Sequence, residues 1–134
     1  MKLLMFGLGV VAFALAMVTT ASAHHSFAAE FDGSKPVTLT GHVTKIEWSN
    51  PHVWFYINVK KEDGAIENWG FEMGPPHLLQ VTGWNRTTMK LGDAVVVTGF
   101  MAKNGTKRAN ARTVTMAATG ERLGAGSSQQ QLNQ

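Results

Sequence analysis

The sequence predicts a mostly-β domain, and more specifically a small five-stranded barrel of the oligonucleotide/oligosaccharide-binding (OB) type. Five segments have the alternation or β-branched composition of strands, and one short segment between the third and fourth is typical of a helix. The chain has 134 residues, of which 44% are apolar, enough for one packed core and too few for two domains. An open β-sandwich or another small barrel is the alternative arrangement of these strands.

The first predicted strand is long and bends. Residues 37–43 alternate with period two, with apolar side chains mostly at odd positions, and the apolar positions become even at Ile46 and Trp48. One residue is inserted into the phase, which predicts a β-bulge near Thr44 and Lys45. A first strand that bends midway is what closure of a small barrel requires.

The second and third predicted strands follow Pro51. In residues 53–59 the odd positions are apolar and predict the buried face, while Trp54 and Tyr56 belong to the opposite face. A Glu-Asp-Gly turn then leads into the third strand, residues 66–73.

A short helix is predicted next. The proline pair at 75–76 suits a first helical turn, and Gly83 is placed to end the helix. Leu78, Leu79 and Val81 are its apolar residues.

Two further strands and a tail complete the domain. Residues 94–100 form the most β-prone run of the chain, and residues 109–116 follow an Asn-Gly dipeptide typical of tight hairpins. From residue 120 onwards Gly, Ser and Gln dominate, which predicts a flexible tail.

The first 23 residues have the pattern of a secretory signal peptide. Lys2 is followed by an uncharged apolar run at 3–18 and by the small residues Ala-Ser-Ala at 21–23. The alternative is an uncleaved anchor, but a membrane span needs roughly 20 residues and this run is shorter. We therefore expect a periplasmic or secreted protein, with no membrane attachment after cleavage. The predicted organisation is a signal peptide at 1–23, an OB-like barrel at 24–119 and a flexible tail at 120–134.

Composition excludes several function classes. Cysteine is absent, which rules out disulfides, thiolate metal sites and cysteine nucleophiles. The net charge of +3 is too small to argue for a nucleic-acid partner, and we expect none. Neither the HExxH nor the G-x-S-x-G motif occurs, and no motif pairs the carboxylates of Glu47, Glu67 or Glu72. Binding is therefore a better expectation than catalysis.

Cleavage after Ala23 would create an unusual chemical group. His24 would then carry both an imidazole and a free α-amino group, which together can chelate one metal ion. A third nitrogen would complete a planar site suited to Cu(II), an arrangement called a histidine brace. His52 is the first candidate for that nitrogen, and His25 and His42 are alternatives.

Each of these histidines also has a plainer interpretation. A polar mature end is compatible with cleavage alone, and His52 at a strand start is often a packed or hydrogen-bonding residue. We expect His42 and His77 to be exposed to solvent.

Aromatic and basic residues offer a second type of site. Trp54 and Tyr56 share one strand face and would form a stacking platform for sugar rings or bases, although tryptophans more often serve packing. Four cations surround the last hairpin and would form either an anion-binding corner or a solvated hairpin: Lys103, Lys107, Arg108 and Arg112.

Three segments resemble a family of small exported bacterial proteins catalogued as a domain of unknown function. They are His-His-Ser-Phe at 24–27, Trp-Ser-Asn-Pro-His-Val-Trp at 48–54 and the Leu-Gly-Asp turn at 91–93 with the strand that follows it. The resemblance implies export and a small barrel, and it implies no activity.

These observations favour an exported β-barrel that binds copper through His24 and His52, with His25 as a further ligand. The alternative is a cell-envelope interaction module that uses Trp54 and Tyr56 to bind a protein or glycan partner without a metal.

Overall fold

The computed structural model describes residues 27–126. The predicted signal peptide and two of the predicted metal ligands, His24 and His25, lie outside these residues. Within the described part the order of the elements is α2 (Phe27–Glu30), β1 (Phe31–Glu47), β2 (Trp54–Lys60), β3 (Ile66–Glu72), α3 (Pro76–Val81), β4 (Ala94–Ala102), β5 (Arg108–Met116) and β6 (Arg122–Gly124).

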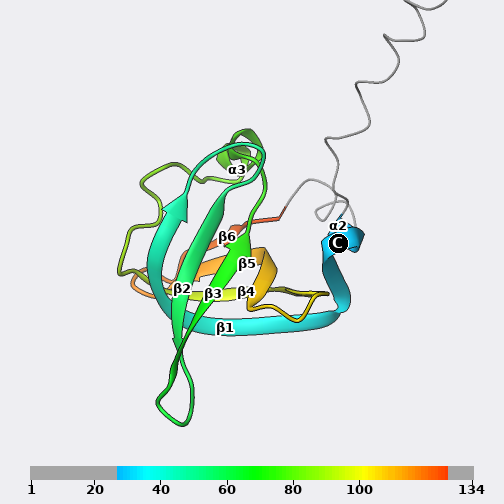
Figure 1. Ribbon diagram of the computed structural model, residues 1–134. Coiled ribbons are helices and arrows are strands. Elements are labelled where there is room, and N and C mark those ends of the chain that lie inside the picture. Colours follow the sequence, from blue (N-terminus) through cyan, green and yellow to red (C-terminus); the bar gives the residue numbers. More distant parts are fainter. Residues whose placement is uncertain (1–26, 127–134) are drawn as a thin grey trace, which may run out of the picture.

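Five of the strands form a sheet that closes on itself (Figure 1). β1 pairs with β2 on one side and with β4 on the other, and β2–β3 and β4–β5 are also antiparallel. The ring closes because β3 pairs in parallel with β5, where Gly70 lies opposite Arg108. The predicted mostly-β domain, with a helix between the third and fourth strands, is therefore confirmed.

β1 is a long strand that bends, and this allows it to pair with both of its neighbours. Its register with β2 shifts between Val43 and Lys45, where the change of hydrophobic phase predicts a bulge. Before this point β1 pairs mainly with β4, and after it β1 continues beside β2 as far as Glu47. The inserted residue thus turns one strand around the ring.

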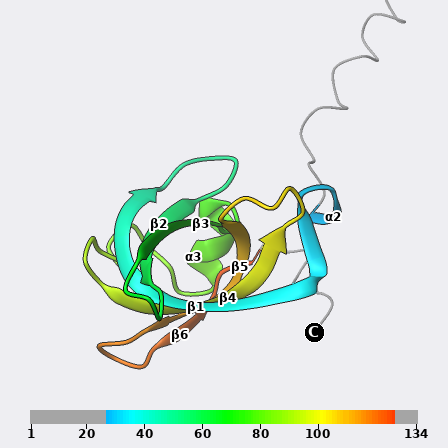
Figure 2. The same cartoon turned by 60° about the horizontal axis from the view of Figure 1, so that its bottom comes forward.

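The core fills the inside of the ring. Phe55 and Phe71 are fully buried and stack with their ring centroids 5.3 Å apart. α3 lies across the far opening of the ring in the view of Figure 2, and its Leu79 is buried in the core. Val81, the last residue of α3, is by contrast 84% exposed, so Leu79 is the residue by which the helix joins the core.

The folded domain extends beyond residue 119, where the sequence predicts a tail to begin. Residues 122–124 form β6 along β5, and Ala125 is fully buried. The Nε1–H group of Trp84 donates a hydrogen bond of 2.8 Å to the carbonyl of Gly124. A buried tryptophan donor needs such a partner, so this segment completes the core.

Between residues 27 and 126, no helix is both long and apolar enough to cross a membrane.

Candidate functional site on the outer face of the sheet

Side chains with functional chemistry gather on the outer face of β2, β3 and β5. Successive residues of a strand point to opposite faces, so the residues flanking the buried Phe55 and Phe71 point outward. Trp54 and Tyr56 are half-buried on this face and stack with centroids 6.5 Å apart and planes inclined at 26°. The prediction that they share a face opposite the core is confirmed.

His52 is held on the same face by a carboxylate. It lies two residues before Trp54, which pairs across the ladder with Glu72. The Met73 amide donates to the Val53 carbonyl and the Val53 amide donates to the Gly74 carbonyl, and these hydrogen bonds extend the ladder past the end of β2. The imidazole therefore reaches Glu72 diagonally, with 2.8 Å between Nδ1 and Oε1.

Glu72 is unusual because it is an acid in a nearly closed environment. It is 8% exposed, and its neighbour in the parallel β5 register, Asn110, is 3% exposed. Burial, reinforced by the negative charge of Glu30, raises the pKa of Glu72 to about 7. Burial also lowers the pKa of His52, an effect that the charge of Glu30 opposes. The charge of Glu30 therefore acts on both members of the pair.

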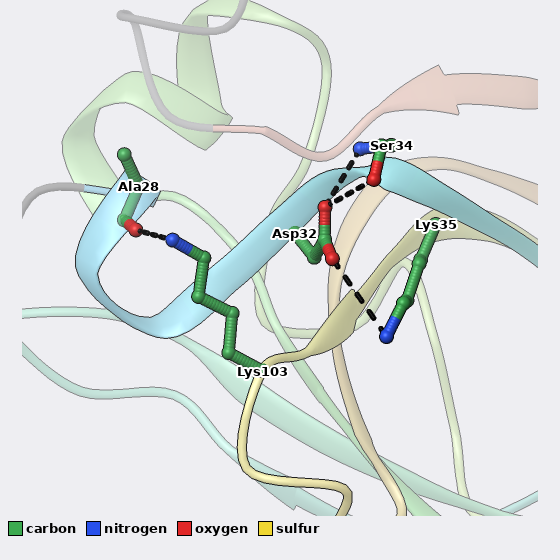
Figure 3. Close-up of polar contacts among 5 residues, drawn as sticks. All are labelled: Ala28, Asp32, Ser34, Lys35 and Lys103. Carbon is green, nitrogen blue, oxygen red and sulfur yellow. Dashed lines mark hydrogen bonds and ion pairs between the residues drawn. The ribbon is translucent and has the colours of Figure 1, made fainter.

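Glu30 belongs to a short arm, α2, that is fastened to the ring. Phe27 stacks on Phe31 at 5.8 Å and meets Phe100 edge-on at 5.7 Å. The ammonium group of Lys103 donates to the carbonyl of Ala28 (Figure 3). The Lys103 amide donates to the carbonyl of Glu30 at 2.9 Å. Two aromatic contacts and two hydrogen bonds thus hold the segment that directly follows residues 24–26.

The turn from the arm into β1 is also fixed. The hydroxyl and the amide of Ser34 both donate to Asp32, at 2.6 and 2.9 Å (Figure 3). These hydrogen bonds hold the pKa of the Asp32 carboxyl below its usual range.

Two cations flank the aromatic pair. The guanidinium carbon of Arg108 lies 5.3 Å from the ring centroid of Trp54, and the ammonium group of Lys45 lies 5.3 Å from that of Tyr56. We call these four side chains the cation–aromatic strip. Gly70 lies beneath the strip, where an added Cβ would be 3.0 Å from the Tyr56 ring.

The basic residues near the last hairpin do not act as one cluster. Lys103 binds the α2 backbone, Lys107 forms a 3.0 Å ion pair with Glu67, and Arg112 lies over Phe100. Arg108 alone of the four joins the strip. Residues 103–108 of the hairpin are nevertheless all exposed to solvent, so of the two expected arrangements the solvated hairpin is the one observed, and the four cations do not gather into an anion-binding corner.

The remaining histidines lie elsewhere. His42 and His77 are exposed, as predicted, and His42 pairs with Asn58, far along β2 from Trp54. Within residues 27–126, no three His, Asp or Glu side chains are arranged to hold a metal ion. His52 is thus the one predicted ligand that the described residues bring to this face.

Sequence reasoning did not identify the partners of His52. Glu72 contacts His52 only because of the strand register, and the charge of Glu30, 42 residues before Glu72 in the chain, acts on His52 only because the arm folds back on the ring. The sequence held one weak signal, which is that Glu72 occupies an outward position of the third predicted strand. An acid at the end of a strand is common, so this position alone does not mark a site.

Comparison with known proteins identifies a family. The model of a family described as "Family of unknown function (DUF6152)" matches residues 12–111, and the chain belongs to this family. No curated protein matches the chain.

Comparison with solved structures gives one that shares the fold. The mitochondrial single-stranded DNA-binding protein Rim1 of S. cerevisiae is similar over 62% of this chain and 93% of its own, with 9% identity and a TM-score of 0.50. The N-terminal domain of PriB from Thermoanaerobacter tencongensis matches 63% of this chain and 97% of its own, with 18% identity and a TM-score of 0.43. At such identities the likeness to Rim1 concerns the fold alone.

Proposed function

We propose that this member of the family is an exported binding protein that holds copper between its processed N-terminus and His52. The observation that carries the proposal is the fastened arm α2. It fixes Phe27, three residues after His24, and it carries Glu30, whose charge acts on both His52 and Glu72. The proposal includes cleavage of residues 1–23 after Ala23, on the signal-peptide pattern of that segment.

The reach of the chain supports this assignment. An extended residue spans at most about 3.6 Å, so the Cα atom of His24 lies within about 11 Å of that of Phe27. An anchor so close to the first residue restricts where the α-amino group and the imidazole can go. A loosely attached terminus would sample a far larger volume and would lose more entropy on binding a metal.

The chemistry of His52 fits a nitrogen ligand. With Glu72 ionised, the Nδ1–H group donates to the carboxylate, which leaves the lone pair on Nε2. A carboxylate on the far nitrogen is the usual partner of a metal-binding imidazole, because it fixes the tautomer and the ring orientation. Within residues 27–126 no other hydrogen bond or ion pair occupies this side chain.

Copper is the metal that this donor set favours. The amine and imidazole of His24 with the imidazole of His52 make three nitrogens, and His25 is a further ligand. Nitrogen donors in a planar arrangement suit Cu(II), and the absence of cysteine leaves no soft thiolate for a rival site.

We also assign the closed ring to the OB type. The helix between β3 and β4, the bent β1 and the parallel β3–β5 closure support this assignment, as does the likeness to Rim1. The metal site proposed here lies on the outside of that ring.

A titration with Cu(II) tests the proposal. One protein begins at His24, a second carries three extra alanines before His24, and a matched control carries the three alanines at the C-terminus. Three residues are added because a single one would make His25 the third residue and so create a different N-terminal Cu(II) chelate. We expect the N-terminal extension to weaken Cu(II) binding about a hundredfold, equivalent to about 2.7 kcal/mol, because it converts the amine into an amide. The C-terminal extension should have no effect. Equal affinities in all three proteins would refute a site built on the His24 amine.

A further inference from the structure

We propose that the cation–aromatic strip binds an acidic sugar chain through Arg108 and Trp54. The strip is separate from the proposed copper ligands, and the inference does not depend on them. Its basis is a hollow of about 320 Å³ between the strip and α2. Trp54, Arg108, Lys103 and Asn104 line this hollow together with parts of α2.

Of the two cations in the strip, Arg108 is the one without an ion pair among the described residues. Lys45 forms an ion pair of 2.5 Å with Glu47, Lys61 and Lys107 both pair with Glu67, and Lys103 binds the Ala28 carbonyl. Across the described part of the chain, by contrast, the guanidinium group of Arg108 has neither an ion pair nor a hydrogen bond. Its planar fork can therefore receive a carboxylate with two parallel hydrogen bonds.

The surroundings position this guanidinium. Arg108 lies over Trp54, and its Cγ is near Gly70, where any Cβ would meet it at 3.7 Å. The glycine thus provides the space in which Tyr56 and Arg108 approach each other across β3. A guanidinium stacked on an indole loses less freedom on binding than one on a free side chain.

The occupant follows from the size and charge of the hollow. A volume of about 320 Å³ is at the small end of ligand sites, which suits one or two sugar rings of a chain. An acidic sugar offers a carboxylate to Arg108, an apolar ring face to Trp54 and hydroxyls to Asn104. The exposed edge of the aromatic pair would carry the next ring of the chain.

The charge pattern disfavours the rival occupant, single-stranded nucleic acid. That polymer needs several phosphate contacts to Lys or Arg, and most cations here are already neutralised. Glu30 also lines the hollow, and Glu47 lies beside Tyr56. An acidic sugar chain carries one carboxylate per ring with neutral hydroxyls between them, and this charge pattern suits a strip with one unpaired guanidinium.

Calorimetric titration with defined oligosaccharides tests the inference. The probes are a tetragalacturonate, its fully methyl-esterified form and an oligodeoxythymidylate, each added to the purified protein at low and at 0.5 M salt. We expect the acidic sugar to bind and to quench tryptophan fluorescence, and the esterified form to bind at least about tenfold more weakly, since the charge-assisted hydrogen bonds to Arg108 are lost.

Variants separate this site from non-specific charge. Arg108→Gln should weaken binding about tenfold or more and Arg108→Lys by a smaller factor, because lysine keeps the charge and loses the fork. Arg122→Gln, which removes an exposed cation on β6, is the matched control and should bind normally. Unchanged melting temperatures would establish that the variants fold. The inference fails if the acidic sugar does not bind at millimolar concentration, if Arg108→Gln binds normally, or if the oligonucleotide binds more tightly.

Discussion

The two faces of β3 differ in what they contribute to the molecule. Phe71 points into the ring, is fully buried and stacks on Phe55. Glu72, the next residue, points outward and is nearly as buried, yet it carries an acid whose ionisation burial disfavours. The inner face therefore stabilises the fold through packing. The outer face holds polar groups at a cost in stability, which is the signature of a functional surface.

The largest expected effect is the loss of stability when a large side chain of the inner face is truncated. We expect Phe71→Ala to lower the free energy of unfolding by about 3–5 kcal/mol, because it leaves a cavity in a closed core. Trp54→Ala, which changes the outward side of the neighbouring strand, should lower it by about 1 kcal/mol. Urea denaturation of both variants measures the two values. Equal losses would show that the outer aromatic residues also belong to the core.

Replacing Glu72 is expected to raise the free energy of unfolding, by less than the loss expected for Phe71→Ala. Its pKa is about 7 in the folded protein and 4.5 ordinarily, so folding takes up a proton between these pH values. Stability from this group is thus full below pH 4.5 and falls as the pH rises towards 7. Glu72→Gln removes this loss and keeps a hydrogen-bonding partner for His52. We expect the variant to be more stable than the parent protein by roughly 1–3 kcal/mol at pH 8 and close to it at pH 4.

Chemical denaturation of the metal-free proteins across this range measures the difference. The lowered pKa of His52 acts in the other direction, because its contribution is lost as the pH falls below 6.5. Comparing the variant with the parent protein at each pH isolates the part due to Glu72. A Glu72→Gln variant that is less stable at pH 8 would mean that the ionised pair stabilises the fold.

The fold was largely predictable because its determinants are local. The alternation of residues 53–59, the change of phase at Lys45 and the proline pair before α3 each correspond to an observed feature. The polar composition after residue 119 hid β6, because a three-residue strand is stabilised by its neighbours rather than by its own sequence. α2 was missed for the same reason, since four residues are too few for a helical pattern.

The candidate site was predictable only in part. Trp54, Tyr56 and His52 are neighbours on one strand face, so their association follows from the period of the strand. Glu72 and Arg108 join them through pairing partners that are distant in the sequence. Register across a closed ring depends on every strand at once, and no local pattern specifies it.

The central claim is that the fastened arm brings the first residue of the mature protein to His52. Electron spin echo envelope modulation of the Cu(II)-loaded protein beginning at His24 counts the imidazoles bound equatorially to the metal. We predict one imidazole fewer in His52→Ala than in the parent protein and in the His77→Ala control, with weaker Cu(II) binding in that variant. An imidazole count and an affinity unchanged by His52→Ala would contradict the account.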